Sequence, residues 1–254
     1  MRADEAMDAM ARGAPLSPLL MEDDALFLDL DGTLLDIAAT PDAVVIPRDL
    51  RATLASLTGV LGGALAIISG RPLSQIDALL GATRLPAAAE HGAVIRLPNG
   101  SLEEHALSLP GQDAWLAGLR AATSRWPGVF IEVKPHSLVV HFRQAPTYAD
   151  AVRALVDRLA ARDPEAIEVL PAKMAWEIKR CGVDKGAALR RLMRDPVFAG
   201  RRPVFIGDDT TDEPAIAEAM LLGGMGLHVA RDFGGKAGSV RAWLRESLSG
   251  LQPE

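Results

Sequence analysis

Short apolar runs alternate with amphipathic stretches along most of the chain, and the two patterns predict different elements. A short apolar run that ends at glycine or a polar residue is typical of a strand covered on both faces, as in a parallel sheet. Such runs predict strands at residues 25–30, 64–69, 86–90, 203–206 and 227–229. Apolar residues on one side of a helical repeat, as at Leu50, Leu54 and Leu57, predict helices at residues 48–59, 74–80, 185–193, 213–221 and 238–248. Residues 94–107 predict a hairpin that turns at Pro98-Asn99-Gly100.

The pattern changes between residues 112 and 181. Two rounds of one helix followed by two strands are predicted there, at residues 113–126, 129–134, 138–143, 147–162, 166–170 and 173–179. We therefore expect a doubly wound, mostly parallel (Rossmann-like) α/β core, interrupted by an inserted α+β cap of order αββαββ. The expected domains are an extension at 1–24 with a short helix near 4–12, the core at 25–111 and 182–254, and the cap at 112–181.

Composition narrows the possible functions. Of 254 residues, 49% are hydrophobic, and the net charge of −6 argues against a general nucleic-acid binder. The single cysteine, Cys181, excludes an internal disulfide and fits a reducing compartment. The apolar run at residues 59–70 is too short to cross a bilayer, and the acidic residues 1–24 lack the pattern of a secretory signal. We expect a cytoplasmic monomer that binds neither nucleic acid nor a membrane.

Two carboxylates stand at the predicted end of the first strand, in Asp29-Leu30-Asp31-Gly32-Thr33. Ligands of open α/β sheets bind at the carboxyl ends of strands. An aspartate there can attack phosphorus and form an acyl-phosphate while a second carboxylate moves protons. An ordinary Asp-Gly turn after a core strand is the alternative interpretation.

A second acidic segment, Gly207-Asp208-Asp209-Thr210-Thr211-Asp212-Glu213, follows another predicted strand. Carboxylates this dense repel one another unless a cation neutralises them, and oxygen ligands suit Mg²⁺. A solvated acidic turn with Asp212 as a helix cap explains Asp212 and Glu213 equally well. It explains Asp208 and Asp209 poorly, because they come directly after a buried strand.

Two further residues lie at ends of predicted elements. Ser69, before Gly70-Arg71, can donate to a phosphate oxygen, although a turn serine is common there. Lys185 opens a predicted helix, where the helix dipole favours anions. A cation at that position is explained if it faces a phosphate or the aspartates, and an exposed surface lysine is the alternative.

The order of these four segments along one α/β core resembles the haloacid dehalogenase superfamily of phosphatases. The resemblance covers nearly the whole chain after residue 24. It implies Asp29 as the nucleophile, Asp31 as the general acid and base, and Ser69 with Lys185 as phosphoryl-binding residues. It also implies that Asp29, the Asp31 carbonyl and Asp208 bind Mg²⁺, with Asp209 and Asp212 as auxiliary metal groups.

Strand alternation in the cap places charged residues on one face of its sheet and apolar residues on the other. Ile131 and Val133 share one face, and Glu132 and Lys134 share the opposite one. Either a solvated sheet face or a surface that binds a polyhydroxylated ligand fits this pattern.

The cap segments resemble those of trehalose-6-phosphate phosphatases, which implies a sugar phosphate substrate. The substrate-binding residues implied are Arg71, Glu90, His91, Gly92, Glu132, Lys134, Arg143, Lys173 and Glu177. Arg180-Cys181-Gly182 departs from the family pattern and leaves the hinge geometry open, and His91 fits a structural role equally well.

The sequence leaves two alternative functions open. A related enzyme could act on sucrose phosphate, mannosylglycerate phosphate or a hexose phosphate. A phospho-accepting signalling domain would be phosphorylated on one aspartate without turning over a substrate. The inserted cap and the presence of Asp31 beside Asp29 argue against the signalling domain.

Overall fold

The computed structural model describes residues 18–37, 44–81, 84–104, 112–133, 137–164, 166–172 and 174–252. The described residues of Met1–Glu103 and Asp184–Glu254 form a larger compact unit, and those of Glu104–Val183 form a smaller one. The short helix expected near residues 4–12 lies outside the described residues. Within the described part of the chain, no helix is both long and apolar enough to cross a membrane.

The larger unit is built on a seven-stranded sheet of order β11-β10-β1-β2-β3-β4-β5. Its strands are β1 (Asp24–Leu28), β2 (Leu65–Ile68), β3 (Ala87–Ala89), β4 (Val94–Arg96), β5 (Leu102–Glu104), β10 (Arg202–Gly207) and β11 (Met225–His228). The first five strands in that order are parallel, and β4 is antiparallel to β3. The predicted mostly parallel α/β core is therefore confirmed.

The parallel strands are mostly apolar because both faces of the sheet are covered. Every residue of β1 and β2 is buried, and Phe27 of β1 stacks on Phe198 with ring centroids 5.2 Å apart. Burial of each such side chain contributes about 1.5–3 kcal/mol, so the sheet centre is a rigid support for the loops at its edge.

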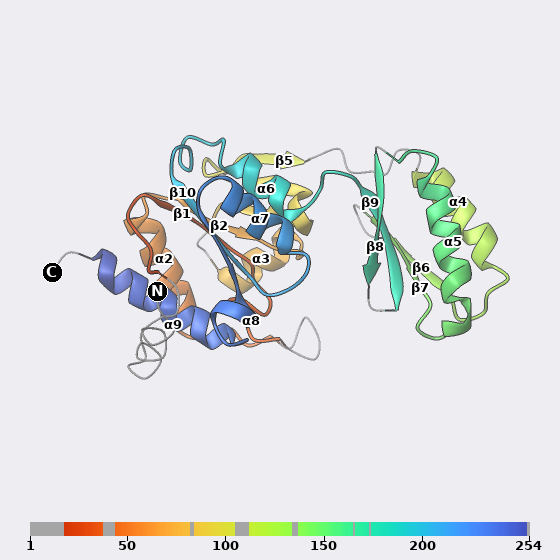
Figure 1. Cartoon of the computed structure of the whole chain (residues 1–254), viewed down its shortest axis with the longest axis horizontal. Coiled ribbons are helices and arrows are strands. Elements are labelled where there is room, and N and C mark those ends of the chain that lie inside the picture. Colours follow the sequence, from red (N-terminus) through yellow and green to blue (C-terminus); the bar gives the residue numbers. More distant parts are fainter. Residues whose placement is uncertain are drawn as a thin grey trace. The chain divides into compact units, whose positions relative to one another are not determined.

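Helices cover both faces of this sheet. They are α2 (Leu50–Val60), α3 (Leu73–Leu80), α6 (Lys185–Leu192), α7 (Glu213–Leu221), α8 (Val229–Asp232) and α9 (Ala237–Leu251), with a 3₁₀ turn, η2 (Glu90–Gly92). The helices α2 and α9 pack together, as do α6 and α7 (Figure 1). Because crossovers between parallel strands are right-handed, connections that run in opposite directions along the sheet place their helices on opposite faces. Several element ends differ from the prediction by one to three residues, the third strand ends at Ala89, where η2 begins, and α8 was not expected.

The smaller unit has a four-stranded antiparallel sheet of order β6-β7-β9-β8. Its elements are α4 (Gln112–Thr123), β6 (Phe130–Val133), β7 (Ser137–His141), η3 (Pro146–Tyr148), α5 (Ala149–Ala160), β8 (Ile167–Ala172) and β9 (Ala175–Arg180). This is the predicted αββαββ order. The last strand begins at Ala175 instead of 173, since Met174 has a φ of 58° and belongs to the turn.

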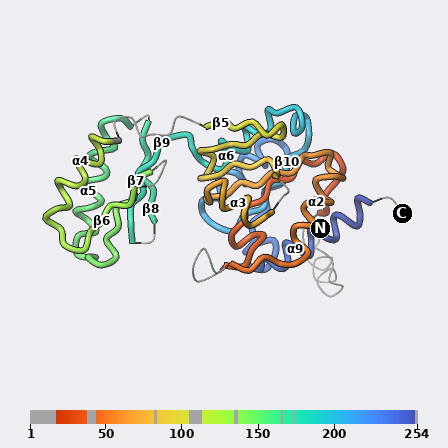
Figure 2. The backbone as a smooth tube through the Cα atoms, turned by 180° about the vertical axis from the view of Figure 1, so that it is seen from behind, coloured from red at the N-terminus to blue at the C-terminus, as the bar shows by residue number. Residues whose placement is uncertain are grey.

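Both helices of the smaller unit lie on one side of its sheet (Figures 1 and 2). Leu138, Val140 and Ile178 point into the core beneath these helices. No described helix of this unit covers the other face, which we call the open face. Val133 departs from the expected pattern, because it is 49% exposed although it alternates with Glu132.

Candidate active site

Two acidic segments meet where the strand order of the larger unit reverses. The strand that follows β1 in the sequence, β2, lies on one side of the β1–β10 pair, and the strand that follows β10, β11, lies on the other side. The boundary between β1 and β10 is therefore a topological switch point, where open α/β sheets bind ligands. Asp29 directly follows β1, and its N–H donates to the Ile206 carbonyl of β10 at 3.0 Å. Asp208 directly follows β10.

A buried lysine joins two of the carboxylates. The Lys185 Nζ lies 2.7 Å from Asp29 Oδ1 and 2.6 Å from Asp212 Oδ1. Asp184 caps α6 by accepting the Ala187 N–H at 2.8 Å, which holds Lys185 in the first turn of that helix. Lys185, Asp29 and Asp212 are all buried. The cation is thus a site component and not an exposed surface lysine.

Burial and mutual repulsion dominate the ionisation of these groups. Burial raises the pKa of Asp29 to about 8, although Lys185 acts in the opposite direction. Burial likewise raises the pKa of Asp208 and of Asp212, with repulsion from Asp212 adding to the effect at Asp208. Burial would lower the pKa of Lys185, but the charges of Asp29 and Asp212 outweigh it and raise that pKa. Lys185 therefore stays protonated.

The carboxylates of Asp29, Asp208 and Asp212 can each place one oxygen within 4.8 Å of the others. One ammonium group faces three carboxylates, so two negative charges are left over when all three are ionised. A divalent cation with oxygen ligands would balance that charge, and this donor set fits Mg²⁺. The sequence predicted an auxiliary role for Asp212, and its carboxylate lies beside those of Asp29 and Asp208 while it binds Lys185.

Asp212 also shapes the loop that carries Asp208. Its Oδ2 accepts the backbone N–H groups of Asp208 at 2.9 Å and Asp209 at 3.1 Å. The Asp209 carboxylate instead accepts the N–H and hydroxyl of Thr211 at 2.8 and 2.7 Å. Burial would raise the pKa of Asp209, but the hydrogen bonds from Thr211 outweigh it and lower that pKa. The Asp209 carboxylate thus stabilises the turn between Asp209 and Thr211.

Position 32 requires glycine because the Asp208 side chain lies very close to its backbone. Its φ of 80° lies in the left-handed region, and a Cβ built on it would be 2.1 Å from Asp208 Oδ2. The absence of a side chain at Gly32 therefore lets the loop after β1 come against the Asp208 carboxylate.

Asp31 is bound by an arginine and lies outside this cluster. Arg71 Nε is 2.6 Å from Asp31 Oδ2, and Arg71 Nη2 is 2.7 Å from Asp31 Oδ1. The Asp31 side chain remains 40% exposed, whereas that of Arg71 is 12% exposed. Arg71, expected to bind substrate, thus orients the expected general acid in this structure.

The loops after β2 and β3 are joined by backbone hydrogen bonds. Ser69 is buried, and its Oγ accepts the Arg71 N–H at 3.2 Å. The Glu90 N–H donates to the Arg71 carbonyl at 3.1 Å, and the His91 N–H donates to the Ser69 carbonyl at 3.0 Å. Glu90, His91 and Gly92 all have positive φ. Such strained backbone at non-glycine residues is concentrated at functional sites.

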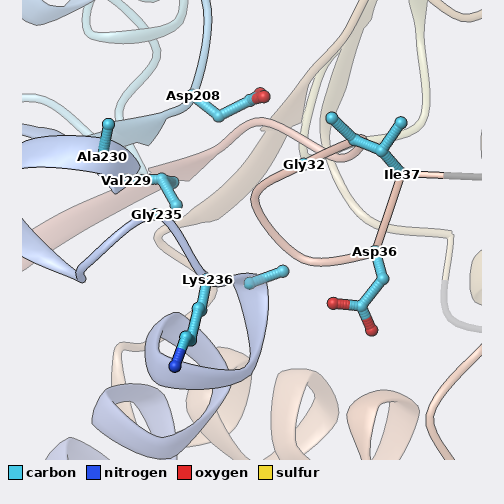
Figure 3. Close-up of a pocket in the computed structure, with 9 residues that line it drawn as sticks. Gly32, Asp36, Ile37, Asp208, Val229, Ala230, Gly235 and Lys236 are labelled. Carbon is cyan, nitrogen blue, oxygen red and sulfur yellow. The ribbon is translucent and has the colours of Figure 1, made fainter.

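A cavity of about 320 Å³ adjoins the acidic cluster (Figure 3). It is lined by Gly32, Asp36, Ile37, Asp208, Val229, Ala230, Gly235, Lys236 and Ala237. In Figure 3 the Lys236 amine points away from Asp208. Apart from Gly32 and Asp208, the sequence did not single out these residues. Gly234-Gly235-Lys236 before α9 is the pattern that could have indicated them.

The remaining predicted residues lie in the smaller unit. Glu132 and Glu177 share the open face and flank Val139, since Val139 pairs with both. Glu177 Oε1 accepts the Ser137 hydroxyl at 2.6 Å. Arg143 is exposed just beyond β7. Lys134 and Lys173 lie outside the described residues.

Comparisons with known proteins show which family and fold the chain shares. The family model described as trehalose-phosphatase matches residues 27–236. Trehalose-6-phosphate phosphatase of Escherichia coli is 39% identical over 215 residues, which cover 84% of this chain and 80% of that protein. The structure of trehalose-6-phosphate phosphatase from Aspergillus fumigatus is 26% identical with a TM-score of 0.67, covering 91% and 99% of the two chains. A haloacid dehalogenase-like hydrolase from Bacteroides thetaiotaomicron shares the fold at 17% identity (TM-score 0.61, covering 89% and 97%).

Proposed function

This chain belongs to the trehalose-phosphatase family, and we propose that it hydrolyses trehalose 6-phosphate to trehalose and phosphate. It is a phosphatase, a hydrolase of phosphoric monoesters. The observation that carries the proposal is the buried Asp29, in contact with Lys185 and close to Asp208, at the switch point of the sheet.

Asp29 is the nucleophile of the proposed reaction. One of its carboxylate oxygens forms a bond to phosphorus while the phosphorus–oxygen bond to the sugar breaks. Asp31 donates a proton to the departing sugar oxygen. Asp31 then removes a proton from the water that attacks the aspartyl-phosphate, which releases phosphate and restores Asp29.

Lys185 and Ser69 assist by holding the phosphoryl group. The Lys185 ammonium, fixed between two carboxylates, offsets the negative charge of the phosphate oxygens. The Ser69 hydroxyl, at the end of β2, donates to one of these oxygens. Both groups are buried and therefore positioned before the substrate arrives.

Mg²⁺ is the proposed cofactor. Asp29, Asp208 and the main-chain carbonyl of Asp31 would hold it, with Asp212 keeping the Asp208 loop in place. A bound Mg²⁺ would neutralise charge on the phosphate and on the carboxylates around it. Asp209, which is occupied by Thr211, is assigned only an auxiliary role.

Recognition of the sugar is assigned to the remaining predicted residues. Glu132 and Glu177 on the open face offer acceptors for sugar hydroxyls, and Arg143, Lys134 and Lys173 are assigned the same task as donors. The segment of Glu90, His91 and Gly92 in the larger unit completes this set. The inserted unit is accordingly proposed as the cap domain, with bounds at residues 112–181.

A panel of sugar phosphates tests the substrate assignment. Phosphate release is measured with Mg²⁺ on trehalose 6-phosphate, sucrose phosphate, mannosylglycerate phosphate and hexose phosphates. We expect the highest kcat/KM on trehalose 6-phosphate. A clear preference for another sugar phosphate would overturn the substrate assignment. Transfer of one phosphate per chain without turnover would instead indicate a phospho-accepting signalling domain.

A further inference from the structure

The open face of the smaller unit carries an aromatic pair that the proposed function does not use. Strand pairing places Phe130 opposite His141, two positions before the pair of Glu132 and Val139 along the same two strands. Since residues two apart in a strand share a face, Phe130 and Glu132 both lie on the open face.

The Phe130 ring stacks on the His141 ring and is about half exposed to solvent. Its centroid lies 4.4 Å from that of His141, with an angle of 11° between the ring planes. Phe130 is nevertheless 51% exposed. One face of the Phe130 ring is thus covered by His141, and much of the ring remains exposed to solvent on the same sheet face as Glu132.

His141 also binds that carboxylate. Its Nε2 lies 2.8 Å from Glu132 Oε2. An ionised carboxylate can only accept, so the imidazole N–H donates this hydrogen bond. A single imidazole ring therefore fixes both the aromatic surface of Phe130 and the direction of Glu132.

We propose that Phe130 and His141 form a stacking surface for a pyranose ring of the substrate, with His141 positioning Glu132 toward the ring hydroxyls. This inference rests on the proposed function. A pyranose has apolar C–H faces and a rim of hydroxyls, so an aromatic face next to an oriented carboxylate matches it in both respects. Acyclic aliphatic phosphate esters, such as glycerol 2-phosphate, would gain nothing from this surface.

The matched control lies on the same strand. Val133 is 49% exposed, close to the value for Phe130, but alternates onto the opposite face of the sheet. Phe130→Ala and Val133→Ala therefore each remove a half-exposed apolar side chain, one from each face. Phe130→Leu keeps apolar bulk without a ring, and Phe130→Tyr keeps the ring.

The test compares kcat/KM on trehalose 6-phosphate with kcat/KM on glycerol 2-phosphate, which has no ring to stack, for each variant. The selectivity ratio should fall about tenfold in Phe130→Ala, Phe130→Leu and His141→Ala, and stay near the wild-type ratio in Val133→Ala and Phe130→Tyr. A Phe130→Leu ratio equal to that of Val133→Ala overturns the inference. A wild-type enzyme that does not prefer trehalose 6-phosphate overturns the proposed function instead, before any variant is compared.

Discussion

Arg71 binds both carboxylate oxygens of Asp31, with Nε 2.6 Å from Oδ2 and Nη2 2.7 Å from Oδ1. Two parallel hydrogen bonds fix the plane of a carboxylate as well as its position. The residue assigned to proton transfer is thus oriented by an arginine from the loop after β2, and this contact has consequences for catalysis.

Arg71→Lys should lower kcat/KM on trehalose 6-phosphate by about ten- to a hundredfold, because lysine retains the charge but cannot make the paired contact. The loss on p-nitrophenyl phosphate should be smaller, since a good leaving group needs little protonation. Steady-state kinetics on both substrates measures the difference. Equal losses on the two would show that Arg71 acts on phosphate binding and not through Asp31.

Asp208→Asn should weaken Mg²⁺ binding by at least about tenfold, because it removes a charged oxygen ligand from the cluster. The neighbouring change Asp209→Asn is the matched control. Its carboxylate is occupied by Thr211, so the affinity should change by no more than about twofold. Titration calorimetry gives both constants, and similar losses in the two variants would contradict the assignment of ligands.

Mg²⁺ affinity should rise with pH up to about 8. Burial raises the pKa of Asp29 to about 8 and also raises those of Asp208 and Asp212. Because the cation binds the ionised carboxylates, binding releases protons at pH values below the pKa of these groups. Each proton released lowers the Mg²⁺ affinity by up to about tenfold for every unit by which the pH is lowered. Calorimetry in buffers of different ionisation enthalpy counts those protons. An affinity that is constant between about pH 6 and 8 would contradict the prediction.

Gly32→Ala should lower turnover strongly while lowering the free energy of unfolding only slightly. Gly32 and Gly100 have φ of 80° and 83°, so alanine at either position should destabilise the fold by about 1 kcal/mol. Only at Gly32 would the new Cβ meet Asp208, whereas nothing lies within 4 Å at Gly100. Turnover should fall about a hundredfold in Gly32→Ala and remain near wild type in Gly100→Ala, which denaturant unfolding and kinetics test together.

The sequence predicted the elements of this fold well because parallel strands buried on both faces leave an apolar signal. It also indicated Asp29 and Asp208, since each follows such a strand. The central position of Asp212 and the pairing of Arg71 with Asp31 were not predicted. Both depend on which way a side chain points from a loop, and that is decided by backbone contacts between segments far apart in the chain.

The strained segment from Glu90 to Gly92 shows the same limit. A strand was predicted as far as residue 90, but Glu90 and His91 adopt positive φ. Local propensity does not favour this conformation, and hydrogen bonds to the loop after β2 stabilise it. On the open face, alternation correctly placed Glu132 and Glu177 together, whereas the stacking of Phe130 on His141 required knowledge of which strands pair.

The central claim is that Asp29 becomes phosphorylated during turnover. The direct measurement is acid quenching of the Asp31→Asn variant, supplied with Mg²⁺ and trehalose 6-phosphate, followed by peptide mass spectrometry. Loss of the base at Asp31 slows hydrolysis of the intermediate, so phosphate should accumulate on the peptide that contains Asp29 and be absent from the Asp29→Asn, Asp31→Asn double variant. Phosphate on Ser69, Asp208 or any other residue would contradict this account.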